Sequence, residues 1–158
     1  MAIRCIIFDV GGVLLKENID KVHGAINHEL GKKIFDRKDA LHKKALLGEI
    51  SEKEFYEIFS RKHGIPAKHL QSLSDTKYLK IARVNKDTMK IAKRLKKNYK
   101  TCILSNVSPM HKKHDFKIRL YSNFNYVVLS CVVGAAKPSP RIFRIALKNL
   151  KARPEECV

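Results

Sequence analysis

The sequence predicts an α/β protein, in which helices cover a parallel β-sheet and a helical insertion interrupts the chain. Three observations support this fold class. Residues 4–8 form a short β-branched, apolar run that stops at Asp9 and the pair Gly11-Gly12, as buried parallel strands do. A long helical pattern follows, and strand-like and helix-like patterns then alternate from about residue 84 onward. This alternation predicts a parallel sheet with right-handed crossovers.

The helical pattern between the first strand and the remainder predicts a small all-α insertion over residues 17–83. Its best-marked helix begins at Ser51, which stands three residues before Glu54 in the spacing of a capping box. Gly64 and Pro66 end this helix. Its apolar residues recur at helical spacing and predict a face packed on neighbouring helices; they are Phe55, Ile58 and Phe59. Two further helices are expected, over residues 19–30 and 39–47.

The second half of the chain predicts alternating helices and strands. Asn85 is expected to cap a helix, and a strand follows over residues 99–104. Pro109 is expected to open a helix that runs to about residue 120, and residues 126–130 predict a third strand. Ser139-Pro140 supplies the N-cap and first residue of the last helix. We therefore assign residues 1–16 and 84–158 to the α/β core.

Composition and charge exclude several classes of protein. The 158 residues are 44% hydrophobic and 30% charged, which is typical of a soluble globular protein. No apolar run is long enough to cross a bilayer, so no membrane anchor is expected. The four cysteines lack metal or redox spacing and predict free thiols in a reducing cytoplasm. Although the formal charge is +18, the basic residues are scattered over separate helices, so nucleic-acid binding is not expected.

Polar residues follow each predicted strand. They are Asp9 after the first strand, Ser105-Asn106 after the second, and Lys137 after the third. Because the carboxyl ends of parallel strands face one crevice, these side chains are expected to meet there. A carboxylate, a hydroxyl with a neighbouring amide, and an ammonium group suit phosphoryl transfer.

These segments resemble the motifs of the haloacid dehalogenase-like hydrolase superfamily. IIFDVGGVLL resembles the first motif, ILSN the second and SCVVGAAKPSPRIFRIAL the third, and their order along the chain also matches. The resemblance implies a Rossmann-like, three-layer parallel sheet with an α-helical cap inserted after the first motif, at residues 17–83. It also implies a phosphatase that acts on a small phosphorylated metabolite.

The resemblance assigns a role to each residue of the predicted site. Asp9 would be the nucleophile, would form an aspartyl-phosphate and would bind Mg²⁺ together with the backbone carbonyl of Gly11. Ser105 and the amide of Asn106 would bind the phosphoryl oxygens. Lys137 would neutralise both the phosphate and Asp9. Taken singly, each residue also has a purely structural interpretation, as a capping carboxylate, a turn hydroxyl or a surface cation.

The sequence departs from the family pattern at two places. Gly11 stands where many of the family's phosphatases have a second aspartate that acts as the acid and base. The fourth motif, an acidic pair that completes the magnesium site, is expected on the strand after residues 154–158, so the chain reads as an incomplete core. With the later strands absent, residues 4–8 would form an exposed sheet edge, so the 158-residue chain would be either markedly less stable than an extended one or self-associated through this edge.

These departures leave alternatives open. A non-catalytic protein that keeps the fold and acts by interaction is the second interpretation, and a haloacid dehalogenase, which needs no magnesium, is the third. His111 and His114, with Asp115 nearby, share a helix face and could indicate a separate metal site, although no further ligand is evident. The sequence identifies neither the substrate nor which insertion residues, such as His23, His42 and Tyr56, face it.

Overall fold

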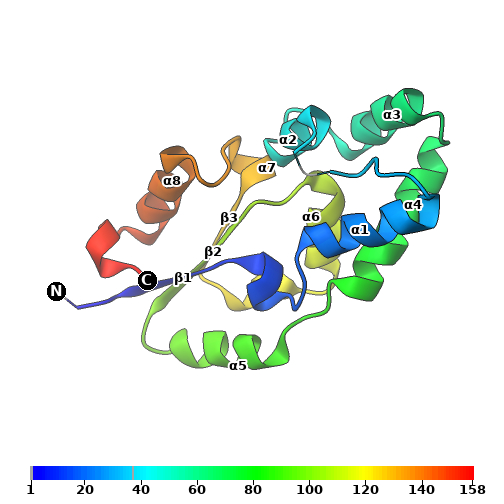
Figure 1. Ribbon diagram of the computed structural model, residues 1–158. Helices are drawn as coiled ribbons and strands as arrows, with labels where there is room; N and C mark the ends of the chain where they lie inside the picture. Colours follow the sequence, from blue (N-terminus) through cyan, green and yellow to red (C-terminus); the bar gives the residue numbers. More distant parts are fainter. Residues whose placement is uncertain (1, 37) are drawn as a thin grey trace.

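Three parallel strands form the centre of the molecule (Figure 1). The computed structural model describes residues 2–36 and 38–158. The strands are β1 (Cys5–Phe8), β2 (Lys100–Ser105) and β3 (Tyr126–Leu129), and they lie in the order β1-β2-β3. Cys102 of β2 is in register with Ile7 on one side and with Tyr126 on the other. The predicted parallel sheet is therefore confirmed.

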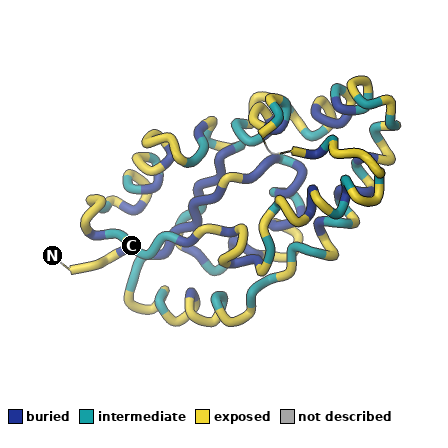
Figure 2. Tube along the Cα trace, viewed as in Figure 1, coloured by how far each residue is buried: buried dark blue, intermediate teal, exposed yellow. Residues whose placement is uncertain are grey.

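Helices cover both faces of this sheet and complete three layers. Helix α8 (Pro140–Leu150) packs on one face, where its buried residues contact Cys102 and Leu104 of β2. The other face carries Ile103, which belongs to a larger core together with Ala92 of α5 (Lys86–Leu95). Figure 2 shows the buried strands between helices whose outer sides are exposed. Successive residues of β2 thus point to opposite faces, each of which is covered by a helix.

Four helices lie beyond the carboxyl ends of the strands (Figure 1). They are α1 (Ile19–Leu30), α2 (Ala40–Leu46), α3 (Glu52–His63) and α4 (Ala67–Ile81). The predicted capping box at Ser51 and Glu54 is present at the start of α3. The chain leaves the sheet and returns to it at one place, because Leu15 and Val84 form an antiparallel bridge. Whether this helical segment works as a cap stays a prediction.

The region after β2 departs from the expected boundaries. Helix α6 (Pro109–Lys117) ends before residue 120, because Arg119 adopts a left-handed conformation with φ 54°. A 3₁₀ turn, η2 (Leu120–Asn123), then leads to β3. Ser130, expected at the end of the third strand, instead begins the one-turn helix α7 (Ser130–Val133). A short helix therefore separates β3 from the segment that contains Lys137.

Polar contacts fasten the helical segment to α6. The carboxylate of Asp115 is fully buried and accepts hydrogen bonds from Tyr78 of α4 and Tyr121 of η2, each at 2.7 Å. Nε2 of His114 lies 2.8 Å from Asp75, and Lys113 forms an ion pair with Asp75 at 3.0 Å. Lys113 also contacts Glu52 of α3. These side chains therefore have structural partners, and within the described ranges no group of three or more His, Cys, Asp or Glu residues could hold a metal ion.

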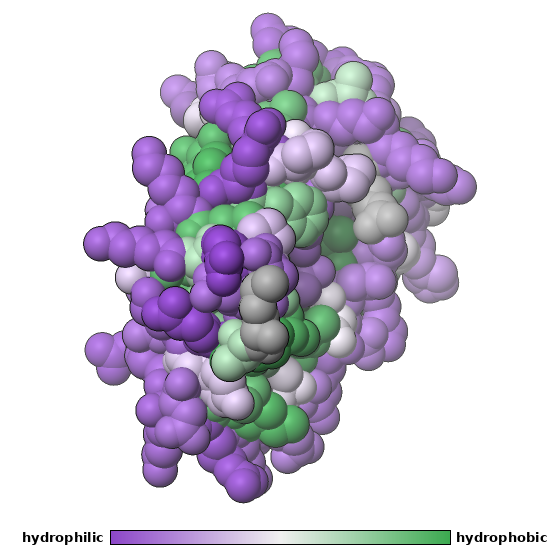
Figure 3. Space-filling model, turned by 90° about the vertical axis from the view of Figure 1, so that its left-hand side faces the viewer, coloured by the Kyte–Doolittle hydropathy of each residue, from purple (hydrophilic) through white to green (hydrophobic). Residues whose placement is uncertain are grey.

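Less of the β1 edge is unpaired than the sequence predicts. The short 3₁₀ turn η3 (Pro154–Glu156) precedes a segment that pairs with β1 in parallel, through the Cys5–Cys157 bridge. The amide of Val158 donates to the carbonyl of Cys5, and the amide of Ile7 donates to the carbonyl of Val158. Figure 3, which views the side of the molecule nearest the two termini, shows apolar patches among hydrophilic side chains. The edge is thus partly paired instead of fully exposed.

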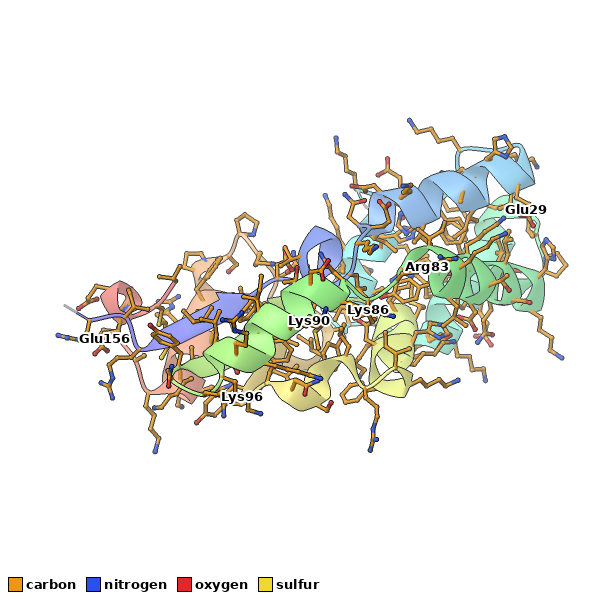
Figure 4. The ribbon with its side chains drawn as sticks, turned by 90° about the horizontal axis from the view of Figure 1, so that it is seen from below. Glu29, Arg83, Lys86, Lys90, Lys96 and Glu156 are labelled. Atoms are coloured by element: carbon orange, nitrogen blue, oxygen red, sulfur yellow. The ribbon has the colours of Figure 1, made fainter. Side chains whose placement is uncertain are left out.

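The positive charge is spread over the surface. Lys86 and Lys90 of α5, and Lys96 directly after it, are exposed on the underside of the molecule (Figure 4). Glu156 lies at the end of the molecule nearest the termini (Figure 4), where it accepts a hydrogen bond from Arg4 at 3.3 Å.

Over residues 2–36 and 38–158, no helix has both the length and the apolar character that a membrane span requires.

Candidate active site

The loop after β1 presents Asp9 at the carboxyl edge of the sheet. Oδ1 of Asp9 accepts a hydrogen bond from the amide of Val10 at 2.7 Å and so caps a tight turn, η1 (Val10–Leu14). Within this turn Gly12 has φ 75°, a conformation that strongly favours glycine. The Asp9 side chain remains 46% exposed at the end of a strand that is otherwise largely buried.

Lys137 lies next to this carboxylate. Its Nζ is 2.9 Å from Oδ1 of Asp9 and donates to the carbonyl of Leu104 at 3.0 Å. Oδ2 of Asp9, by contrast, has no protein partner among the described residues. The ammonium group is therefore held by one carboxylate oxygen and by the end of β2, while the second carboxylate oxygen remains available.

Asn106 fixes the segment that carries Lys137. Its Nδ2 donates to the carbonyl of Lys137 at 2.9 Å, and its Oδ1 accepts from the amide of Lys137 at 2.8 Å. This reciprocal pair joins the loops after β2 and β3. The sequence predicted Asn106 only as a phosphate-binding amide, so the positioning contribution of its side chain was missed. A side-chain amide that pairs with one distant peptide group leaves no pattern in the sequence.

Ser105 ends β2 and Ser130 directly follows β3, where the two loops begin. Ser105 ends β2 with 3% of its surface exposed and lines the same cavity as Asp9 and Lys137. Ser130, which is fully buried, accepts from the amide of Val107 at 3.0 Å and donates to its carbonyl at 3.2 Å. The loop after β2 is therefore tied to the start of α7.

The four predicted side chains and Gly11 line one cavity of about 230 Å³. It lies between the strand ends and the helical segment, and its wall also includes Glu17, Asn18, Tyr78, His111 and Asp115. The structure thus brings Asp9, Gly11, Ser105, Asn106 and Lys137 together, as the convergence of strand ends requires. It also adds His111, a buried histidine whose Nδ1 lies 2.9 Å from the hydroxyl of Ser108.

Burial shifts the pKa of His111 more than the neighbouring charges do. Removal of His111 from water lowers its pKa well below the ordinary value, and neighbouring basic groups, beginning with His23, add to the effect. His111 is therefore uncharged at neutral pH. Lys137 is then the charged group in contact with the predicted nucleophile, and Glu17 and Asp115 line the same cavity.

The donor atoms at this site are of the type that Mg²⁺ prefers. Asp9 and the carbonyl of Gly11 supply hard oxygen donors on one wall of the cavity. Glu155 and Glu156 do not extend this set. The backbone of Glu156 pairs with Arg4 at the amino end of β1, whereas Asp9 follows its carboxyl end. A magnesium ion held here would complete its coordination with water and phosphate oxygens, as this ion commonly does.

Fold and site together place the chain among three-layer α/β proteins whose chemistry lies at the carboxyl edge of a parallel sheet, with an aspartate after the first strand and a lysine after the third. Within that class it belongs to the haloacid dehalogenase-like hydrolase family, whose sequence profile matches residues 3–158.

Individual relatives agree with this membership. The chain is 28% identical to bifunctional epoxide hydrolase 2 of Sus scrofa, over all of this chain but only 33% of that protein. It therefore spans about a third of this curated relative. Among solved structures, a haloacid dehalogenase family enzyme of Bacteroides thetaiotaomicron, in complex with magnesium and inorganic phosphate, superposes with a TM-score of 0.80 at 20% identity. That match covers 99% of this chain and 83% of the other.

A second solved structure is described as a predicted HAD-like family hydrolase from Porphyromonas gingivalis. It superposes with a TM-score of 0.80 at 26% identity, and the match covers 99% of this chain and 80% of the other. The fold is thus the family's along nearly the whole chain.

Proposed function

We propose that the protein is a magnesium-dependent phosphatase that hydrolyses small phosphomonoesters through an aspartyl-phosphate on Asp9. The observation that supports this proposal best is the Asp9–Lys137 pair, with 2.9 Å between Oδ1 and Nζ, in a cavity that also holds Ser105 and Asn106. The magnesium and inorganic phosphate bound by the Bacteroides thetaiotaomicron enzyme add support.

The proposed reaction has two steps. Oδ2 of Asp9, which lacks a protein partner among the described residues, attacks phosphorus, and the bond from phosphorus to the leaving oxygen breaks. Lys137, Ser105 and the amide of Asn106 hold the phosphoryl oxygens. The alcohol leaves with a proton from water, because Gly11 offers no carboxyl group. Water then attacks the aspartyl-phosphate, releases phosphate and restores Asp9.

Asp9 and the carbonyl of Gly11 would hold Mg²⁺, which offsets negative charge on the phosphoryl group when it is bound. Residues 17–83, as a cap, would close over a small phosphorylated metabolite. Four free cysteines, two of them buried and two partly exposed, support the proposal of a reducing, cytoplasmic setting.

The test is Asp9→Asn in the 158-residue protein. An amide keeps the shape of the side chain but is a poor nucleophile, so turnover of phenyl phosphate with magnesium is expected to fall below detection. Asp87→Asn, an exposed acid on α5, is the matched control and should keep full activity. Circular dichroism checks that both variants fold. Activity of Asp9→Asn close to that of the control would overturn the assignment.

Metal dependence separates the phosphatase from the dehalogenase interpretation. Removal of magnesium with a chelator should stop phosphate release and leave the fold intact. Release of halide from a 2-haloacid without added metal would instead favour the dehalogenase. A wild-type protein that shows neither activity would favour the interpretation of a non-catalytic protein that acts by interaction.

A further inference from the structure

A second, larger cavity adjoins the one that contains Asp9. Its volume is about 530 Å³, within the range of sites that enclose small organic ligands. The two cavities share six lining residues, which are Ile19, Leu46, Asn106, Ser108, His111 and Lys137. A phosphoryl group held between Asp9 and Lys137 would therefore place its leaving group in the larger cavity.

The charged residues that line this larger cavity are all basic. Lys38 and Lys43 contribute to its wall together with Lys137, and no acidic residue does so within the described part of the chain. Both lysines are exposed, and neither has an acidic partner among the described residues. In the Asp9 cavity, by contrast, Glu17 and Asp115 also line the wall. The larger cavity therefore offers two ammonium groups that the protein itself does not neutralise.

The rest of the wall is apolar or aromatic. Ile19, Leu46 and Leu47 line it, together with the imidazole rings of three histidines, which are His23, His42 and His111. The ring centroid of His23 is 5.0 Å from that of His42 and 6.4 Å from that of His111. Burial lowers the pKa of His42 to about 4, with a smaller effect from His23. At neutral pH the rings of His42 and His111 are therefore uncharged surfaces that suit a planar or apolar group.

We propose that the larger cavity is a subsite for a second anionic group of the substrate, so that the preferred phosphomonoester carries a carboxylate or a second phosphate beyond a planar or apolar spacer. This inference rests on the proposed phosphatase function. Lys38 and Lys43 bind the distal anion, and the spacer contacts Leu46, Leu47 and the histidine rings.

Three aryl phosphates test the subsite. Phenyl phosphate carries only the spacer, 4-carboxyphenyl phosphate adds a carboxylate, and 1,4-phenylene bisphosphate adds a phosphate. We expect kcat/KM to be about tenfold higher for one or both of the doubly anionic esters, as two partly exposed ion pairs would give. Comparison of the two doubly anionic esters distinguishes a carboxylate from a phosphate. No preference for either ester would overturn the proposal.

Two variants test whether the preference is local. Lys43→Gln should reduce the ratio of kcat/KM values between the doubly anionic ester and phenyl phosphate by about threefold. Lys44→Gln is the matched control: it removes the same charge from the next residue of α2, which does not line the cavity. Equal ratios in the two variants would mean that the net charge attracts anions without a subsite, and this result would overturn the proposal.

Equilibrium binding separates failure of the subsite from failure of the phosphatase function. Calorimetric titration of Asp9→Asn with phenyl phosphate and 4-carboxyphenyl phosphate, and with the bisphosphate, needs no turnover. If wild type hydrolyses none of the esters, the phosphatase proposal fails. The subsite is still supported if a doubly anionic ester binds more tightly than phenyl phosphate and Lys43→Gln abolishes this difference. If all three esters bind equally, the subsite is wrong, whatever the activity.

Discussion

Gly11 and Gly12 differ in what they can accommodate. A Cβ atom built on Gly11 would lie 3.8 Å from its nearest neighbours, two atoms of Asn18, which is ordinary van der Waals contact. The backbone of Gly11 has φ −67° and ψ 123°, which any residue can adopt. At Gly12, φ is 75°, so a side chain there would be strained. The loop can therefore accept a carboxylate at position 11 and not at position 12.

This difference predicts a gain of function. Gly11→Asp would place an acid beside the leaving group, and general acid–base catalysis commonly contributes about 10² to 10⁴-fold, so we expect kcat for phenyl phosphate to rise at least about tenfold. Gly12→Asp introduces the same charge at the neighbouring position and should lower the thermal midpoint without a gain in rate. Steady-state kinetics and thermal unfolding of both variants measure this. Equal rates for Gly11→Asp and wild type would show that a carboxyl group at position 11 does not transfer a proton to the leaving group.

At the residue scale, the sequence predicts the polar residues that follow strands better than those on the insertion. The convergence of Asp9, Ser105 and Asn106 follows from strand order, because parallel strands end at one edge. Lys137 lies beyond α7, and the side chain of Asn106 holds its backbone at this edge. The positions of His23 and His42 depend on how α1 and α2 pack over that edge. Both histidines occupy buried helix positions, and their sequence spacing resembles that of ordinary core residues.

At the scale of elements, the contact between α4 and α6 includes one fully buried carboxylate, that of Asp115. Burial raises the pKa of Asp115, although hydrogen bonds from Tyr121 and Tyr78 oppose the change. A raised pKa means that the folded protein binds this proton more tightly than the unfolded chain does. The resulting stabilisation is fully present below the unfolded pKa and is lost as the pH rises through the folded pKa.

Asp115→Asn should therefore change how stability depends on pH. The variant cannot gain this proton, so the free energy of unfolding of wild type relative to Asp115→Asn should increase as the pH falls from about 7 to about 4. Urea unfolding across this range measures the difference, and other titrating groups largely cancel between the two proteins. Asp87→Asn, an exposed acid, provides the control. A difference that shrinks as the pH falls would contradict the raised pKa of Asp115.

Most elements were predictable, whereas several boundaries and the separate helices α4 and α7 were not. The capping box at Ser51 and the proline at position 109 mark helix starts by local chemistry, and both starts are confirmed. The end of α6 depends on Arg119, whose left-handed conformation has no glycine to signal it. Similarly, Ser130 belongs to α7 instead of β3, and its hydroxyl bonds to the backbone of Val107, a contact that only the tertiary structure creates.

In the molecule as a whole, the sheet order leaves one side of β1 only partly paired. Strand β1 pairs with β2 on one side, and on its other side it contacts only the short segment that follows η3 in the described part of the chain. The outer side of that segment forms the edge, and Val158 there is 69% exposed. The backbone groups that stay unpaired along this edge can pair with another strand.

We therefore predict that the 158-residue protein self-associates through this edge. Sedimentation velocity over a wide range of concentrations should show a sedimentation coefficient that rises with concentration. Val158→Lys should shift the equilibrium toward monomer, because an ammonium group on an edge strand must lose its water when two edges meet. Val132→Lys is the matched control: Val132 is 63% exposed but belongs to α7, away from the edge, so its substitution should leave the association unchanged. If wild type sediments as one monomeric species at every concentration, the edge does not recruit a partner. If Val132→Lys weakens association as strongly as Val158→Lys, the contact involves a general apolar surface and not the sheet edge.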